Sequence, residues 1–112
     1  MTYEYNHCGS TYEIMLVKSN YVNNDALAVE MYSLCEDYHE PYASLTVNLP
    51  ESDMLDEETA FVDTNNLPGI DSWLLDNGLA EETWITASSG YCFYCAMHFT
   101  KKFFDTCTTY ED

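Results

Sequence analysis

Three cysteines and one histidine near the C-terminus have the residue types that bind metal ions. Cys92, Cys95 and His98 are each separated by two residues, and Cys107 follows further on. Together they could satisfy the tetrahedral coordination of zinc. On a regular strand, however, residues three positions apart point to opposite faces, and no glycine lies between the two closest cysteines to form a tight turn. We therefore interpret them as buried cysteines on an aromatic-rich strand, and expect neither a metal nor a cofactor.

Other residues with reactive side chains lack the pattern of a catalytic site. His7 and Cys8 are adjacent, and neighbours in a turn seldom form a hydrogen-bonded nucleophile and base. The acidic run Ser52–Glu58 has no ligand spacing for calcium, and is better read as a solvated face. The sequence also contains no glycine-rich phosphate loop and no nucleophile elbow. We expect a protein that is not an enzyme.

The charge is the strongest signal, because the chain has 20 Asp and Glu against three Lys and a formal net charge of −17. No fold requires this imbalance, since like charges on a compact body repel each other. It excludes direct nucleic-acid binding and disfavours anionic membranes, as Lys101 and Lys102 form the one basic cluster. A basic partner is expected instead. The carboxylates expected to contact it form two groups: Glu30, Glu36, Asp37 and Glu40, and Glu51, Asp53, Asp56, Glu57 and Glu58.

Imitation of nucleic acid would require these carboxylates to crowd together. A globule of 12.9 kDa exposes roughly 6,300 Å², which gives about one net charge per 370 Å² when the charge is spread evenly. DNA carries one charge on the order of every 100 Å² of its surface. One continuous negative face would therefore favour imitation, and scattered acids would favour a different role.

Tyrosine is the second compositional signal, with ten residues in the chain. Tyrosine is enriched at binding surfaces, but strands favour it as well. Tyr21, Tyr32, Tyr38 and Tyr42 are expected to be exposed, and Tyr32 and Tyr38 are candidate contact residues beside the first acidic group.

The elements that position these residues are mostly strands. Alternation of apolar and polar residues predicts hairpins and single strands at the following ranges: Thr2–Tyr5 with Thr11–Lys18, Leu27–Cys35, Tyr42–Leu49, Ala60–Asp63, and Glu82–Ala87 with Tyr91–Phe99. In Tyr42–Leu49, Leu45 and Val47 are expected to face inward and Thr46 outward. The run Pro50–Thr59 is a loop or a short helix.

One helix is predicted at about Pro68–Asn77, with Asn66 as its N-cap and the stripe Ile70, Trp73 and Leu74 facing the core. The fold class is α+β: an antiparallel β-sheet with one principal α-helix packed on it. Apolar residues make up 46% of the chain, which excludes a disordered acidic tail. Residues 1–112 are expected to form a single acidic domain.

Several segments have a familiar pattern: Tyr5, Tyr12–Ile14, Ala43–Leu49, Phe61–Pro68 and Ser89–Tyr94. In these segments, and over most of its length up to about Phe99, the chain resembles a small uncharacterised domain family from mobile elements of Gram-positive bacteria. The position of Cys95 is usually proline in that family, which disfavours zinc further. No activity is assigned to it, so the resemblance implies only a setting of plasmids, conjugative elements and phages, where small acidic proteins often disarm host defences.

These observations lead to two hypotheses of function. The first is an acidic inhibitor that imitates nucleic-acid charge and binds a basic nucleic-acid-binding protein of host defence, such as a CRISPR effector or a restriction enzyme. The second is a non-enzymatic regulatory or structural domain of a mobile element that makes protein contacts through a Tyr-rich sheet surface. An odd number of cysteines and an N-terminus without a signal-peptide pattern predict the cytoplasm of the bacterial host.

Overall fold

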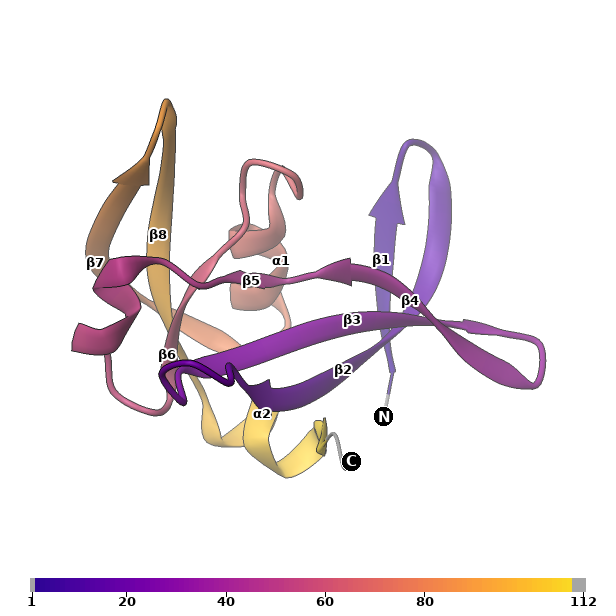
Figure 1. Cartoon of the computed structure of the whole chain (residues 1–112). Helices are drawn as coiled ribbons and strands as arrows, with labels where there is room; N and C mark the ends of the chain where they lie inside the picture. The colour runs from indigo at the N-terminus through magenta and orange to yellow at the C-terminus, as the bar shows by residue number, and fades with distance from the viewer. Residues whose placement is uncertain (1, 110–112) are drawn as a thin grey trace.

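Strands make up most of the chain and form two sheets, which the computed structural model describes for residues 2–109 (Figure 1). The first sheet has the order β1 (Tyr3–His7), β2 (Ser10–Asn20), β3 (Leu27–Cys35) and β4 (Tyr38–Ser44), and β9 (Thr108–Thr109) pairs with β2. The second has the order β5 (Thr46–Val47), β6 (Thr59–Val62), β8 (Cys92–Phe99) and β7 (Ala80–Ser89). All pairs are antiparallel except β2 with β9.

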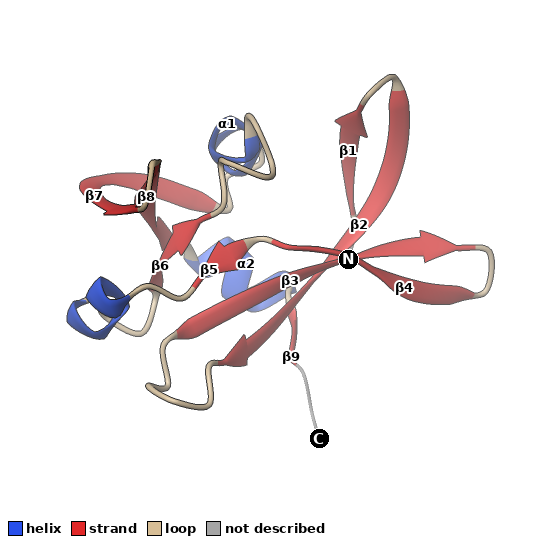
Figure 2. Cartoon of the chain, turned by 45° about the horizontal axis from the view of Figure 1, so that its top comes forward, coloured by secondary structure: helices blue, strands red, loops and turns tan. Residues whose placement is uncertain are grey.

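Three short helices connect or follow these strands (Figure 2). The 3-10 helix η1 (Pro50–Met54) lies between β5 and β6, α1 (Ile70–Asp76) between β6 and β7, and α2 (Lys101–Thr106) after β8. The structure is therefore mostly antiparallel β, with two short α-helices. The sequence predicted one sheet and one principal helix, and the second sheet and α2 are additions to that picture.

The main core lies where both sheets and both α-helices meet. It contains fully buried side chains such as Val29 of β3, Phe99 of β8, Leu74 of α1 and Phe103 of α2. A second, smaller cluster lies on the other face of β6, where Phe61 packs with Leu49 and Ala96. The split follows from strand geometry, because successive side chains point to opposite faces. The second sheet therefore buries apolar groups on both of its faces.

The prediction for α1 is confirmed in its packing and corrected in its N-terminus. Ile70 and Leu74 are fully buried, and Trp73 packs against the main core. The N-cap is Gly69, which has φ of 84°, a left-handed conformation that glycine adopts without steric cost. Asn66 is not the N-cap. Instead its backbone N–H and side-chain amide donate to the buried carboxylate of Asp63, which fixes the loop before the helix.

The predicted strand Leu27–Cys35 is confirmed at both ends, but Tyr42–Leu49 is not one strand. The chain leaves the first sheet after Ser44 and enters the second at Thr46. Leu45, fully buried, joins the two: its N–H donates to Val29 O, and its carbonyl accepts from Asp63 N.

The expectation that Thr46 faces outward is wrong, because its side chain is 2% exposed. The backbone N–H of Val29 donates to Thr46 Oγ1 at 3.1 Å, and the Tyr21 hydroxyl lies 2.9 Å from the same oxygen. The hydroxyl thus satisfies a backbone donor at the junction between the sheets. An apolar residue there would leave that buried N–H without this acceptor.

Candidate partner-binding surface

The first acidic group lies on the β3–β4 hairpin. Glu36 and Asp37 form its turn, with Glu36 at φ of 53°, and both side chains are exposed. Glu40 is exposed on β4 and accepts a hydrogen bond from the thiol of Cys35 at 3.1 Å. This bond to the carboxylate raises the pKa of Cys35 above its ordinary value. Glu30 is half-buried on β3 and accepts from the hydroxyl of Ser44 at 2.7 Å. We name Glu30, Glu36, Asp37 and Glu40 the hairpin acids.

The second acidic group lies on η1 and the turn that leads to β6. Glu51, Asp53, Asp56, Glu57 and Glu58 are all exposed, and we name them the η1 acids. The buried Ser52 stabilises the N-terminus of η1, because its hydroxyl accepts a hydrogen bond from the backbone N–H of Leu49 at 3.0 Å. Five carboxylates are thus exposed within eight residues, on a segment that the buried side chain of Ser52 attaches to the protein.

Two of the η1 acids also make local contacts. Asp56 Oδ1 accepts from the backbone N–H of Glu58 at 3.0 Å and from the Thr59 hydroxyl at 2.7 Å. The bond from Thr59 is the main reason that the pKa of Asp56 lies below its ordinary value. Glu58 Oε1 lies 3.6 Å from Nε2 of His98, whose Nδ1 is 3.1 Å from the Thr59 hydroxyl. Among residues 2–109, Lys101 and Asp105 form the one ion pair between a lysine and a carboxylate.

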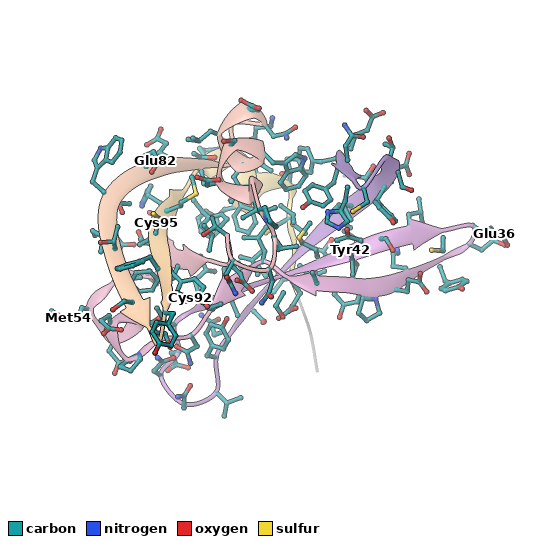
Figure 3. The ribbon with its side chains drawn as sticks, turned by 90° about the horizontal axis from the view of Figure 1, so that it is seen from above. Glu36, Tyr42, Met54, Glu82, Cys92 and Cys95 are labelled. Carbon is teal, nitrogen blue, oxygen red and sulfur yellow. The ribbon has the colours of Figure 1, made fainter. Side chains whose placement is uncertain are left out.

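The two groups lie in different parts of the protein. Glu36 and Met54, the last residue of η1, lie at opposite ends of the view in Figure 3, and the β3–β4 turn and η1 lie at opposite sides of Figure 1. The longest dimension of the molecule is 39 Å. The β3–β4 turn with its acids and the η1 acids therefore lie at two ends of the molecule, as separate patches.

The tyrosines expected at the surface are mostly engaged with the protein. Tyr38 is 60% exposed, whereas Tyr21, Tyr32 and Tyr42 are half-buried. Tyr42 packs against the main core, with its ring 5.9 Å from that of Tyr5 and 5.0 Å from that of Tyr12. A broad tyrosine surface on the first sheet is therefore not present, and Tyr38 alone of the four is exposed.

The cysteine and histidine candidates are separated along β8 and α2. Cys92 stands near the β7–β8 turn opposite Ser89, whereas Cys95 is paired with Val62 and Thr86 in the middle of the sheet (Figure 3). Cys107 follows α2 and packs against the main core, and its burial raises the pKa of the thiol. Within the described part of the chain, no three His, Cys, Asp or Glu side chains are arranged to hold a metal ion.

Sequence reasoning missed a feature of the second sheet beside the η1 acids. The predicted strand Glu82–Ala87 lies within β7, but its pairing with β8 is interrupted between Glu82 and Thr86. Trp84 and Ile85 lie in this interruption, with exposed fractions of 84% and 46%. Two large apolar residues side by side, flanked by threonines and preceded by Glu81 and Glu82, were the one signal of this feature in the sequence. Strand periodicity alone reads them as one inward and one outward side chain.

Comparison with known proteins identifies the family. A family model described as "Domain of unknown function (DUF4313)" matches residues 15–110, so the chain belongs to this family. No curated protein and no solved structure matches the chain significantly. No helix within residues 2–109 has the length and apolar character needed to cross a membrane.

Proposed function

We propose that this DUF4313 protein is a non-enzymatic inhibitor that binds a basic, nucleic-acid-binding protein. The observation that carries the proposal is the display of five exposed carboxylates between Glu51 and Glu58. Their charge lies in a field that is already strongly negative, since the whole chain carries −17. Such a surface attracts a basic partner and accelerates its association.

Local charge density supports imitation of a nucleic-acid strand at the η1 acids. The accessible surface of 6731 Å² divided by 17 net charges gives about 400 Å² per charge, far sparser than DNA. The seven steps from Glu51 to Glu58, however, span at most about 25 Å. Five carboxylates in that length are spaced about 6 Å apart or closer, against one phosphate per about 3.4 Å of a DNA strand. The η1 acids therefore imitate a short stretch of backbone, while the average surface does not.

The partner class is supported by the resemblance to an uncharacterised family from Gram-positive mobile elements. Proteins of phages and plasmids meet the defence nucleases of the bacterial cytoplasm, whose nucleic-acid grooves are lined with Arg and Lys. In our proposal the η1 acids occupy part of such a groove in a CRISPR effector or restriction enzyme, and the hairpin acids form a second contact. The Tyr-rich alternative is less favoured, because Tyr38 is the one exposed tyrosine among those expected.

Charge reversal tests the proposal on the partner found by pull-down from Gram-positive cells that carry defence systems. The variant Glu51→Lys, Asp53→Lys, Glu57→Lys leaves Asp56 and its hydrogen bonds intact. We expect association to slow at least tenfold, because steering by charge contributes on the order of 10–10³ to association rates. Stopped-flow or surface plasmon resonance measures this rate.

A control variant of equal net charge separates a local patch from a general effect. It reverses three exposed acids outside both groups: Glu4, Glu13 and Asp76. If both triple variants slow association equally, the η1 acids are not the contact. If neither does, imitation of nucleic acid is wrong.

A further inference from the structure

The interruption in β7 is a β-bulge held by a threonine. Glu82 pairs with Met97 and Thr86 with Cys95, so three residues of β7 stand opposite Ala96 alone. The Thr83 hydroxyl donates to the carbonyl of Ala96 at 2.7 Å and accepts from the backbone N–H of Ile85 at 3.1 Å. The hydroxyl thus takes the place of ladder partners that the bulge removes. This bulge is a built feature of the strand.

The residue at the centre of the bulge is strained and exposed at once. Trp84 has φ of 64°, in the left-handed region, which is a genuine outlier for a bulky residue. Its side chain is 84% exposed, so no burial in the folded chain compensates for the strain. Backbone outliers of this kind are energetically unfavourable and cluster at functional positions. The bulge directs the largest side-chain type toward solvent.

An apolar cavity lies between η1 and β7, and Ile85, the residue after Trp84, forms part of its lining. It has a volume of about 320 Å³ and is lined by Glu51, Met54, Leu55, Phe61, Ile85 and Thr86. Its floor includes Phe61 of the second core cluster, and Met54 at its rim is 87% exposed. The cavity therefore lies over one edge of the second cluster, whose own side chains stay buried, and Ile85 of the bulge forms part of its lining. Cavities of this size are at the lower end of those that bind small ligands, and match a side chain or two.

The surrounding charge decides what can occupy the cavity. Glu51 is part of the wall, the other η1 acids follow on the same segment, and Glu81 and Glu82 precede the bulge. A second copy of the chain would bring another −17 to the same place, and nucleic acids and anionic membranes are repelled as well. A polypeptide with positive charges around an apolar side chain complements both the cavity and its rim.

We propose that the cavity and Trp84 bind a segment of a basic protein in which an apolar side chain is flanked by Lys or Arg. The apolar side chain enters the cavity above Phe61, and a flanking cation reaches Glu51 or stacks on the indole face of Trp84. This inference rests on the proposed function, since it names the anchor of the same basic partner. Interfaces depend most on such buried anchors, with Trp and Arg over-represented among them.

Two synthetic peptides test the anchor directly by isothermal titration calorimetry. One has a pair of leucines between lysines and arginines, and the other has serines in place of the leucines. We expect the leucine peptide to bind at least tenfold more tightly. Trp84→Asn and Ile85→Ser should each reduce this preference at least fivefold, whereas Leu75→Gln, a change at an exposed leucine of α1, should leave it unchanged. Added salt should weaken the binding of both peptides and leave the ratio of their affinities unchanged.

Stability measurements separate loss of the anchor from loss of the fold. Asparagine tolerates the left-handed region, so Trp84→Asn should melt at or above the temperature of the native chain. If Trp84→Asn lowers the preference for the leucine peptide while its melting temperature is equal to or higher than that of the native chain, the result supports the anchor. Unfolding of this variant would contradict the claim that Trp84 is strained for binding, and Ile85→Ser then provides the independent test.

The remaining outcomes overturn one proposal or the other. Equal affinity for both peptides, or no binding of the leucine peptide, overturns the anchor. If the anchor fails in this way but the charge reversal of Glu51, Asp53 and Glu57 still weakens binding of the partner found by pull-down, the proposed function stands without the anchor. If the reversal and salt both change nothing, the proposed function fails as well. A dimer in sedimentation that Trp84→Asn dissociates would make a second copy the occupant, against our inference.

Discussion

At the scale of single residues, the η1 acids differ in what they do for the fold. Asp56 accepts from the Thr59 hydroxyl and the Glu58 N–H, so its charge stabilises the turn into β6. Glu51 instead forms part of the cavity wall. A carboxylate that closes a turn cannot be reversed without structural cost, whereas one at a cavity rim can. The same acidic run therefore contains both structural and displayed charges.

The lowered pKa of Asp56 predicts a specific pH dependence. Because this folded-state pKa lies below the ordinary value of 3.8, the carboxylate adds stability above that pH, and the contribution is lost as the pH falls through the folded-state pKa. Asp56→Ala should cost about 1 kcal/mol at pH 7, a small value because the group is exposed. Urea unfolding of both proteins at pH 7 and pH 3 should show this difference shrinking. A difference that is constant with pH would mean that the ionised form is not what the turn requires.

At the scale of elements, periodicity predicted strands wherever one face is buried and the pairing is regular. It gave Leu27–Cys35 correctly and located the β1–β2 and β7–β8 hairpins, but it missed the first half of β4. It failed at two places, Thr46 and Thr83, and the cause is the same. In each, a threonine hydroxyl replaces a backbone hydrogen-bond partner, which lets the strand switch sheets or bulge. The spacing of apolar residues does not indicate where this happens, because it carries no information on hydrogen bonds from side chains to the backbone. Such a bond replaces one between the backbones of neighbouring strands.

The candidate site was predictable in composition and not in arrangement. The η1 acids are exposed, as their polar segment indicated, but their distance from the hairpin acids depends on how two sheets are placed. The cavity beside them could not be predicted, because it exists between η1 and a bulge. Trp84 looked like an ordinary strand residue for the same reason.

Helix α1 offers a matched pair of leucines for testing how elements pack. Leu74 is fully buried in the main core, and its neighbour Leu75 is 40% exposed. Leu74→Ala should destabilise the protein by about 2–5 kcal/mol through lost contacts and a cavity, while Leu75→Ala should cost less than about 1 kcal/mol. Chemical denaturation measures both, and the shared substitution removes helix propensity as an explanation. If the two substitutions lowered the free energy of unfolding by similar amounts, the helix would be rotated about its axis relative to the orientation described.

At the scale of the whole molecule, two acidic ends set the geometry of any partner. The longest dimension of 39 Å corresponds to about 11 base pairs of DNA. A partner that contacts both the η1 acids and the hairpin acids must therefore present a basic surface of comparable length. A shorter partner contacts one end, and the apolar cavity favours the end with η1. Variants of the two groups should then differ in effect, and the difference reports the size of the partner.

The same charge that attracts a basic partner also opposes folding, so salt should act on the two processes in opposite directions. Between 0.1 M and 1 M salt the screening length falls from about 10 Å to about 3 Å. Self-repulsion among 17 net negative charges weakens, and the melting temperature should rise. Steered association weakens over the same range, and its rate should fall. Each acid-to-lysine reversal adds two charges, so the triple variant of Glu51, Asp53 and Glu57 has a net charge of −11 and should gain less stability from salt. Calorimetry in potassium chloride, with sucrose as an uncharged control for solvent effects, measures the rise. If salt leaves the melting temperature unchanged, the acids are already far enough apart for repulsion to be negligible, and the dense patch that imitation requires does not exist.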